Sequence, residues 1–240
     1  APTLPICATP GAVLAALESA GARGAAARGR AAAAHEAYLA WSEPEASGGA
    51  GGVDLGAVVA HLREAAPDAI VTNGAGNYAI WAHRFWRYRD FDAQLAPTSG
   101  SMGYGLPAAI AAALCRPDRE VICFAGDGCL QMTLQELGTA AQTGARLIVL
   151  VADNRSYGTI RMHQERAYPG RVSATDLVNP DFAALARAYG LLGETVRANA
   201  DFAEAFARAR AAEGPALIHL HTDVERITPA TTLAALRARA

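Results

Sequence analysis

The chain of 240 residues contains no lysine, so all 21 of its basic side chains are arginine. It also has no apolar run of the roughly 18 residues that a membrane-spanning helix needs. Its formal net charge of −2 gives no electrostatic reason to bind nucleic acid or an anionic membrane. We therefore expect neither nucleic acid nor a membrane among its partners.

Cysteine is scarce, and the four cysteines show no CxxC spacing. This pattern predicts neither a disulfide framework nor a zinc ribbon, and it favours reduced thiols in a cytoplasmic protein. The first residue is alanine rather than methionine, and no signal peptide is visible. We therefore expect a cytoplasmic protein, seen here as a processed chain or as a fragment.

The composition, with 52% hydrophobic and 18% charged residues, is typical of a globular protein with a substantial core. From Val53 onward, short apolar runs alternate with helix-length segments. This alternation predicts an α/β fold, with a doubly wound, mainly parallel sheet and helices on both faces. We expect this domain to occupy residues 53–240. Residues 42–52 have the composition of a linker, and residues 1–41 are too few to bury a core of their own.

One stretch, Glu120–Gly158, has the pattern of a strand, a turn, a helix and a second strand. Its first apolar run, Val121–Ala125, stops at the turn Gly126–Gly128. Its second run, Leu147–Ala152, stops at Asp153 and Asn154. Because the carboxyl ends of neighbouring parallel strands lie side by side, we expect the polar residues after these two strands to converge.

The residues at these two strand ends suit a particular ligand. The carboxylate of Asp127, the amide oxygen of Asn154 and a nearby backbone carbonyl are oxygen donors of the kind that Mg²⁺ prefers. Gly126 and Gly128 let the backbone approach a ligand closely, and the free N–H groups at the start of the next helix favour an anion. The stretch therefore predicts a Mg²⁺–diphosphate site.

The GDG triplet, a spacer of this length and a terminal Asn resemble the signature of thiamine diphosphate-dependent enzymes. Asp153 departs from the more usual Asn, at a position that does not bind the metal in that family. The resemblance implies one set of ligands for Mg²⁺ and another for the diphosphate: Asp127, Asn154 and the backbone carbonyl of Ser156 for the metal, and Gly128 with Cys129 for the diphosphate.

The segment TSGSMGYGLPAA, residues 98–109, resembles an element of the acetolactate synthase and benzoylformate decarboxylase group. By this resemblance the Gly100 carbonyl and the Met102 backbone contact the pyrimidine ring of the cofactor, and the Met102 side chain supports its bent conformation. The resemblance extends from Val53 to about Asp223, as a pyrophosphate-binding domain, and it makes residues 1–41 the remnant of a preceding central domain.

A glycine-rich loop flanks the predicted diphosphate site. Gly76 and Asn77 follow a predicted strand and are expected to help hold the diphosphate. The stretch Gly74–Ala79 also fits the pattern GxGxxG/A, so an NAD-dependent oxidoreductase is an alternative that rests on this weak match alone.

The segment after Asn154 predicts a helix over the cofactor, with Tyr157 and Ile160 at the cofactor itself. The resemblance implies a substrate pocket formed by Thr159, Ile160 and His163. His163 is the candidate catalytic residue, because a histidine can orient a substrate carboxylate or relay a proton near neutral pH. The alternative is a histidine on the surface or one with a packing role.

A second cluster of metal-binding side chains is suggested by the predicted strand Pro215–His221. His219 and His221 fall on one face of this strand, with Asp223 nearby. No third ligand is evident from the sequence.

The resemblance implies a thiamine diphosphate-dependent lyase or transferase, specifically a decarboxylase or carboligase of a 2-oxo acid. In this family a glutamate that activates the cofactor comes from a separate pyrimidine-binding domain. Once residues 1–41 and 53–240 are assigned as above, too few residues remain for such a domain. We therefore expect a homo-oligomer or a separate chain to supply it. The alternative is a non-catalytic or regulatory subunit with the same fold. FAD, present in some relatives, would bind mainly to a central domain.

Overall fold

The structure is a computed structural model that describes residues 3–21, 27–45 and 51–239. The chain divides into two compact units, Ala1–Trp41 and Ser42–Ala240. The first unit contains the helices α1 (Pro10–Ser19) and α2 (Ala27–Trp41), and no residue of α1 is buried. No helix in the described residues is both long enough and apolar enough to cross a membrane.

The first residues of the predicted linker belong to the packed part of the second unit. Ser42 is fully buried, and its backbone carbonyl accepts a hydrogen bond of 3.2 Å from Arg63. Glu43 forms ion pairs of 2.8 Å with both Arg63 and Arg87. Residues 46–50 of the predicted linker lie outside the described residues, and the interpretation of residues 1–41 as a domain remnant stays a prediction.

The second unit is built on one six-stranded sheet in which every pairing between neighbouring strands is parallel. From one edge to the other, the strands are β2 (Gln94–Leu95), β1 (Ile70–Asn73), β3 (Val121–Gly126), β4 (Ile148–Asp153), β6 (Ala216–His221) and β5 (Leu192–Val196).

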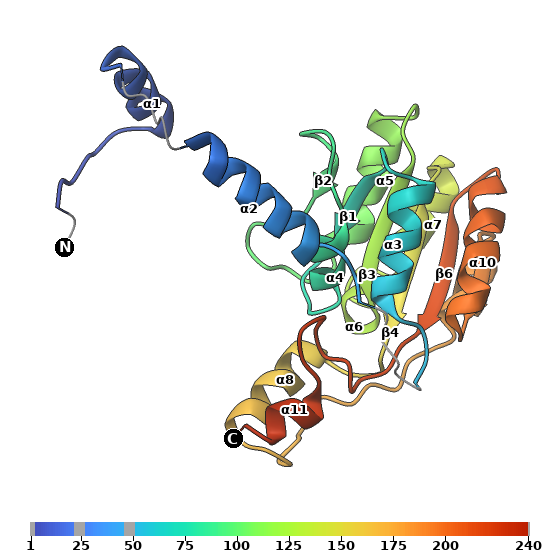
Figure 1. Cartoon of the computed structure of the whole chain (residues 1–240). Coiled ribbons are helices and arrows are strands. Elements are labelled where there is room, and N and C mark those ends of the chain that lie inside the picture. The colour runs from blue at the N-terminus through green and yellow to red at the C-terminus, as the bar shows by residue number, and fades with distance from the viewer. Residues whose placement is uncertain (1–2, 22–26, 46–50, 240) are drawn as a thin grey trace. The chain divides into compact units, whose positions relative to one another are not determined.

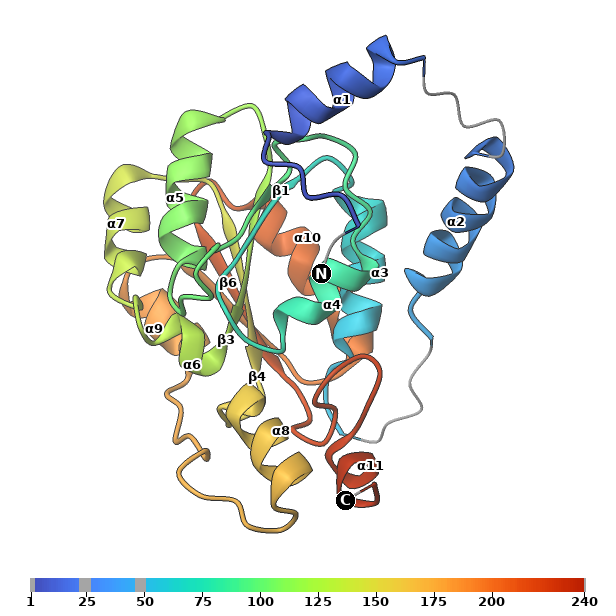
Figure 2. The same cartoon turned by 90° about the vertical axis from the view of Figure 1, so that its left-hand side faces the viewer.

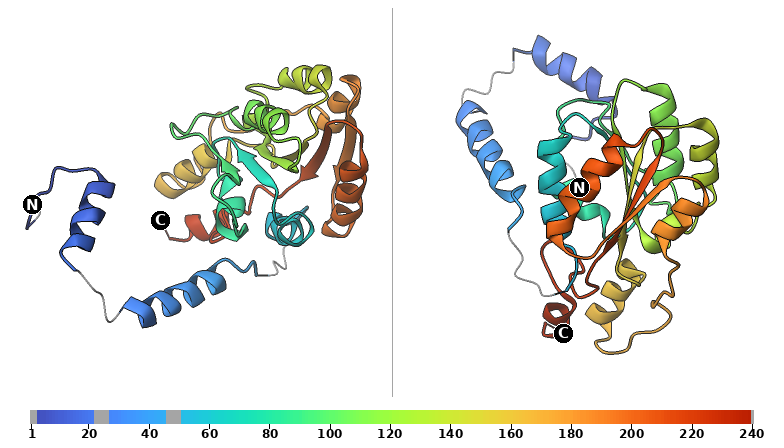
Figure 3. Two further views of the ribbon diagram at one scale, coloured as in Figure 1. Left: turned by 90° about the horizontal axis from the view of Figure 1, so that it is seen from above. Right: turned by 90° about the vertical axis from the view of Figure 1, so that its right-hand side faces the viewer.

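Helices cover both faces of the sheet, as Figures 2 and 3 show. The helices on one face are α3 (Leu55–Ala65), α4 (Ala79–Phe85) and α10 (Asn199–Ala211). The helices on the opposite face are α5 (Gly105–Cys115), α7 (Glu136–Thr143) and α9 (Phe182–Ala188). This is the doubly wound α/β fold that the alternating sequence pattern predicts.

The strands are buried on both faces, which explains their continuous apolar sequences. In β3, Ile122 and Phe124 pack into the cluster that contains residues of α3 and α10. Val121, Cys123 and Ala125, which alternate with them, pack into the cluster on the other face. Each strand of this kind therefore helps to hold two helical layers at once.

A third group of helices lies at the carboxyl ends of the strands (Figure 1): α6 (Asp127–Leu130), α8 (Gly158–Ala167) and α11 (Leu233–Arg237). Helices α8 and α11 pack against each other, and the buried carboxylate of Glu165 in α8 pairs with Arg237 in α11.

The strand order creates a crevice at this end of the sheet. After β1 the chain adds β2 on one side, and it then returns to add β3 and β4 on the other. Ligands of open α/β sheets bind where the order of the strands reverses in this way, outside the carboxyl ends. The GDG turn follows β3, so the topology brings it to that position.

Candidate functional site

A cleft of about 500 Å³ lies at the carboxyl ends of β1, β3 and β4. Its walls come from the loop after β1, the turn after β3, the loop after β4 and the start of α8. The residues that line it are Ala75, Gly76, Asn77, Tyr78, Met102, Gly126, Asp127, Gly128, Cys129, Ala152, Asn154, Ser156, Tyr157, Gly158, Thr159 and Ile160. Every predicted site residue is among them except Gly100 and His163.

Asp127 is a buried carboxylate at the floor of this cleft. Its Oδ1 accepts a hydrogen bond of 2.8 Å from the Gly128 N–H, and its Oδ2 accepts one of 2.8 Å from Asn179 Nδ2. Burial raises the pKa of Asp127 above its usual range, although both hydrogen bonds act to lower it. Both hydrogen-bond donors are neutral amides, and the neighbouring Asp153 carboxylate further raises the pKa. A buried carboxylate with no cationic partner among the described residues suits a bound cation, which would favour its ionised form.

The two glycines of the turn permit close packing around Asp127. A Cβ atom at Gly126 would lie 2.5 Å from the ring of Tyr78, and one at Gly128 would lie 2.6 Å from the ring of Tyr157. Both distances are too short for any side chain. The glycines therefore let two aromatic rings pack directly against the backbone of the turn.

The loop after β4 brings further oxygen atoms to the cleft. Asn154 Oδ1 accepts a hydrogen bond of 3.0 Å from the Ser156 N–H. Between them, Arg155 adopts a left-handed conformation with φ of 57°. Ser156 is buried, and its hydroxyl donates to the Thr175 carbonyl at 3.1 Å. The Asp127 carboxylate, the Asn154 amide and the Ser156 carbonyl form an all-oxygen donor set, which fits Mg²⁺.

The loop after β1 is tied to helix α8 across the cleft. The Asn77 N–H donates to Thr159 Oγ1 at 3.1 Å, and this hydroxyl donates to Asn77 Oδ1 at 2.9 Å. Asn77 Nδ2 donates to the Ile227 carbonyl at 3.1 Å. The structure thus brings Asn77 and Thr159 to the cleft and engages their side chains with each other. Their predicted roles toward cofactor and substrate stay predictions.

The predicted pyrimidine contacts differ in position. Met102 lines the cleft and is 38% exposed. Gly100 does not line it, and a Cβ atom there would meet nothing within 4 Å. Its φ of 68°, rather than packing, is what favours glycine at this position.

His163 lies away from the cleft. Its side chain is exposed on α8, and Arg166 Nη2 donates to its Nδ1 at 2.7 Å. The structure therefore does not bring the candidate catalytic histidine to the other site residues, and the surface alternative describes its position.

Tyr78 is a cleft residue that the sequence does not single out. Its hydroxyl donates to Cys129 Sγ at 3.1 Å, and its ring stacks on Phe124. Burial, followed by the neighbouring Cys129, raises the pKa of Tyr78 well above its usual value. The phenol therefore stays neutral and forms an aromatic wall. The sequence shows it only as a variable position of a glycine-rich loop.

Asn179 is the second residue that the sequence does not single out. Its Nδ2 donates both to Asp127 Oδ2, at 2.8 Å, and to Asp153 Oδ1, at 2.7 Å. Burial acts to raise the pKa of Asp153, but hydrogen bonds from His219 and Asn179 outweigh it and lower that pKa. The sequence suggests for Asn179 only a place near a helix start, because the loop that carries it shows no motif.

The sequence that forms the sheet and the cleft matches a known protein family over most of its length. Residues 74–220 match the family described as thiamine pyrophosphate enzyme, C-terminal TPP binding domain. Over 166 residues, which are 68% of this chain, the sequence is 38% identical to the acetolactate synthase large subunit of Parasynechococcus marenigrum (strain WH8102). Over 165 residues it is 33% identical to the acetolactate synthase isozyme 2 large subunit of Escherichia coli (strain K12).

Solved structures agree with this match. The thiamine diphosphate-dependent 4-hydroxybenzoylformate decarboxylase of Rhodococcus jostii RHA1 superposes on 75% of this chain with a TM-score of 0.67 and 34% sequence identity. The benzoylformate decarboxylase of Polynucleobacter necessarius superposes on 72% with the same TM-score and 25% identity. The match spans 27% and 30% of the two synthases and 34% of each decarboxylase chain.

Proposed function

This chain belongs to the thiamine pyrophosphate enzymes, whose C-terminal TPP binding domain it carries, and we propose that it binds the cofactor through Mg²⁺ in the cleft described above. The observation that carries the proposal is the buried Asp127 carboxylate, which lines the cleft beside a second carboxylate, Asp153, and has no cationic partner among the described residues.

Each part of the cleft has a role in this proposal. Asp127, Asn154 and the Ser156 carbonyl would hold Mg²⁺, and the backbone at Gly128 and Cys129 would hold the diphosphate. When bound, thiamine diphosphate supplies the centre at which the bond beside a 2-oxo group is cleaved or formed. The protein positions that centre. Tyr78 and Tyr157 pack against the turn on either side and exclude water from the buried carboxylate.

We propose decarboxylation or carboligation of a 2-oxo acid as the reaction. Support comes from the relatives, which are acetolactate synthases and benzoylformate-type decarboxylases. Met102 and Ile160 are 38% and 54% exposed at the cleft, and they offer apolar surface for a substrate or for another domain. Activity would need a pyrimidine-binding domain, from a second copy or from a separate chain.

One observation bears on the alternative of a non-catalytic subunit: the candidate catalytic residue His163 is exposed on α8 and does not line the cleft. Adding a pyrimidine-domain chain and measuring CO₂ release from a panel of 2-oxo acids separates the two. Release supports the enzyme, and no release despite tight cofactor binding supports the non-catalytic subunit.

The loop Gly74–Ala79, which fits the dinucleotide-binding pattern GxGxxG/A, lies within the residues that match the family and contributes to the same cleft. Thiamine diphosphate binding would therefore account for it. A rise in NADH fluorescence on titration with the protein would revive the oxidoreductase alternative.

The first prediction concerns Asp127. We expect Asp127→Ala to weaken Mg²⁺-dependent binding of thiamine diphosphate by at least about 100-fold, because even the loss of an outer-shell partner of a metal ligand costs 10- to 100-fold. Isothermal titration calorimetry of the full chain, with Mg²⁺ and then with EDTA, measures this.

The matched control is Asp201→Ala, which removes an exposed carboxylate in the first turn of α10. It should bind the cofactor like the unaltered chain. Equal affinity in the Asp127→Ala variant, or binding that survives EDTA, would contradict the proposed metal site.

A further inference from the structure

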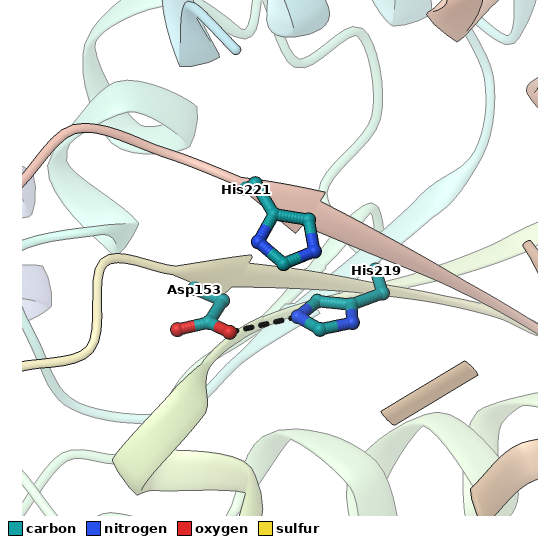
Figure 4. Close-up of side chains that lie close together, drawn as sticks. All are labelled: Asp153, His219 and His221. Atoms are coloured by element: carbon teal, nitrogen blue, oxygen red, sulfur yellow. Dashed lines mark hydrogen bonds and ion pairs between the residues drawn. The ribbon is translucent and has the colours of Figure 1, made fainter. Parts of the chain in front are cut away.

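A second group of metal-binding side chains lies between β4 and β6 (Figure 4). His219 and His221 are two positions apart on β6 and so share one face of the strand. Asp153, at the end of β4, is the register partner of His221. One ligand atom from each of the three residues lies within 4.8 Å of the other two. The third ligand that the sequence does not reveal is therefore Asp153 and not Asp223.

The cluster is buried and only partly satisfied. The side chains of Asp153 and His219 are each 3% exposed, and His219 Nε2 donates to Asp153 Oδ2 at 2.8 Å. His219 Nδ1 and His221 Nε2 are buried without a hydrogen-bond partner in the described part of the chain. A buried nitrogen without a partner is destabilising. His219 Nδ1 lies on the side of Asp181, whereas His221 Nε2, in the register partner of Asp153, lacks a partner that a cation could supply.

We propose that Asp153, His219 and His221 form a site for a transition-metal cation of the Zn²⁺ class, separate from the Mg²⁺ site. Imidazole nitrogen binds Zn²⁺ and related ions well, whereas Mg²⁺ takes oxygen ligands. The site uses Asp153 Oδ2, while Asp153 Oδ1 accepts from Asn179 on the side of Asp127. The two sites thus take different oxygens of one carboxylate.

The three ligand atoms, which lie within 4.8 Å of one another, need to move locally to share one ion. With metal–ligand distances of about 2.1 Å and tetrahedral angles, two ligand atoms lie about 3.4 Å apart. Asp153 Oδ2 and His219 Nε2, now 2.8 Å apart, would separate by about half an ångström. The ion takes the place of the proton between them, and this proton leaves the site or moves to Nδ1 of the same ring.

The surroundings of His219 suit a metal ligand. Asp181 Oδ1 lies 3.9 Å from Nδ1, and a ligating histidine generally directs its second N–H toward a carboxylate or carbonyl. Phe182 packs edge-on against the ring at 5.1 Å between centroids, which fixes the orientation of the ring. His221 is partly exposed, so it lies nearer the surface than Asp153 and His219, whose side chains are buried. The site would join β4 to β6.

The test uses the tag-free full chain in excess Mg²⁺ and without thiamine diphosphate, so that its outcome does not depend on the proposed cofactor site. Titration with Co²⁺ should give the intense visible absorption of a four- or five-coordinate ion with nitrogen ligands, with one Co²⁺ per chain that Zn²⁺ displaces. Co²⁺ in an all-oxygen octahedral site absorbs only weakly. Zn²⁺ should also raise the thermal midpoint of the chain.

The variant is His221→Gln, chosen because this side chain is partly exposed and its loss should leave the fold intact by circular dichroism. We expect at least about a 100-fold loss of affinity, more than the loss of an outer-shell partner costs. His35→Ala, which removes an exposed histidine of α2, should leave binding unchanged. Failure of micromolar Zn²⁺ or Co²⁺ to bind the unaltered chain, or equal binding by His221→Gln, would overturn the proposal.

Discussion

Asn179 holds two buried carboxylates with a single amide nitrogen. Asp127 and Asp153 follow neighbouring strands, and their mutual repulsion in a buried site is opposed by the Nδ2 hydrogens of Asn179. The pKa of Asp127 is raised, mainly by burial, and that of Asp153 is lowered. The two carboxylates therefore differ in pKa, with the raised one at the proposed Mg²⁺ position and the lowered one beside His219.

We expect Asn179→Ala to lower the free energy of unfolding by about 1–3 kcal/mol, because two buried carboxylate oxygens lose a hydrogen bond. The same change should weaken Mg²⁺-dependent cofactor binding, since the Asp127 carboxylate loses the contact that orients it. Urea unfolding and calorimetric titration measure the two effects.

Gln131→Ala provides the comparison. Gln131 donates to Asn179 Oδ1 at 3.0 Å from an exposed position, so its loss removes a contact of Asn179 without touching either carboxylate. Equal unfolding free energies in the two variants would show that the amide bridge contributes nothing to stability.

Helices α8 and α11 depend on one ion pair. The Glu165 side chain is fully buried and pairs with Arg237, while its Oε2 also accepts from the Gly170 N–H at 2.9 Å. The hydrogen bond from Arg237, followed by that from Gly170, lowers the pKa of Glu165 to about 2. Helix α11 has only five residues. The ion pair with Glu165 and the buried side chain of Leu233 hold it in place.

This attachment should depend on pH. Because the folded pKa of Glu165 is lowered, the stabilisation is present above the unfolded pKa of about 4.3 and is lost as the pH falls toward 2. We expect Glu165→Gln to increase hydrogen exchange in residues 225–239 at neutral pH, and the difference from the unaltered chain to shrink below about pH 4.

The exposed Glu204→Gln in α10 is the control for this measurement and should leave exchange in residues 225–239 unchanged. A difference between Glu165→Gln and the unaltered chain that stays constant down to pH 2 would assign the effect to packing rather than to charge.

The sequence predicts the elements whose pattern is strong. Runs such as Val121–Ala125 and Leu147–Ala152 are buried on both faces and appear as β3 and β4. It does not predict β2, which has two residues, or β5, whose residues are mostly half-buried at the sheet edge.

The same distinction applies to the site. Asp127 and Asn154 could be brought together from the sequence because parallel strands end at one edge of a sheet. The position of Asn179 depends on the path of a loop, and that of Tyr78 depends on the space left by Gly126. His163 lies in a helix, as expected, but its side chain is on the exposed side of α8. Helical phase and loop paths are tertiary properties that no local pattern encodes.

The second unit begins at Ser42, and this start should be visible in truncations. A chain that begins at Ser42 keeps the Ser42 and Glu43 contacts with Arg63 and Arg87, whereas one that begins at 46 loses them. We expect the shorter chain to be less stable by about 1–3 kcal/mol, because the half-buried Arg63 loses Ser42 and Glu43 and keeps the Phe85 carbonyl as a partner. Urea unfolding of the two truncated chains measures this, and equal midpoints would place the start of the unit later.

The position of β6 in the sheet has a consequence for biosynthesis. β6 is the last of the six strands to be made, yet it lies between β4 and β5 rather than at an edge. Until it emerges from the ribosome, β4 keeps an unpaired apolar edge and β5 has no neighbour to join. Unpaired strand edges invite wrong pairing with other chains. The nascent protein is therefore most in need of a chaperone in the interval before β6 has emerged and paired.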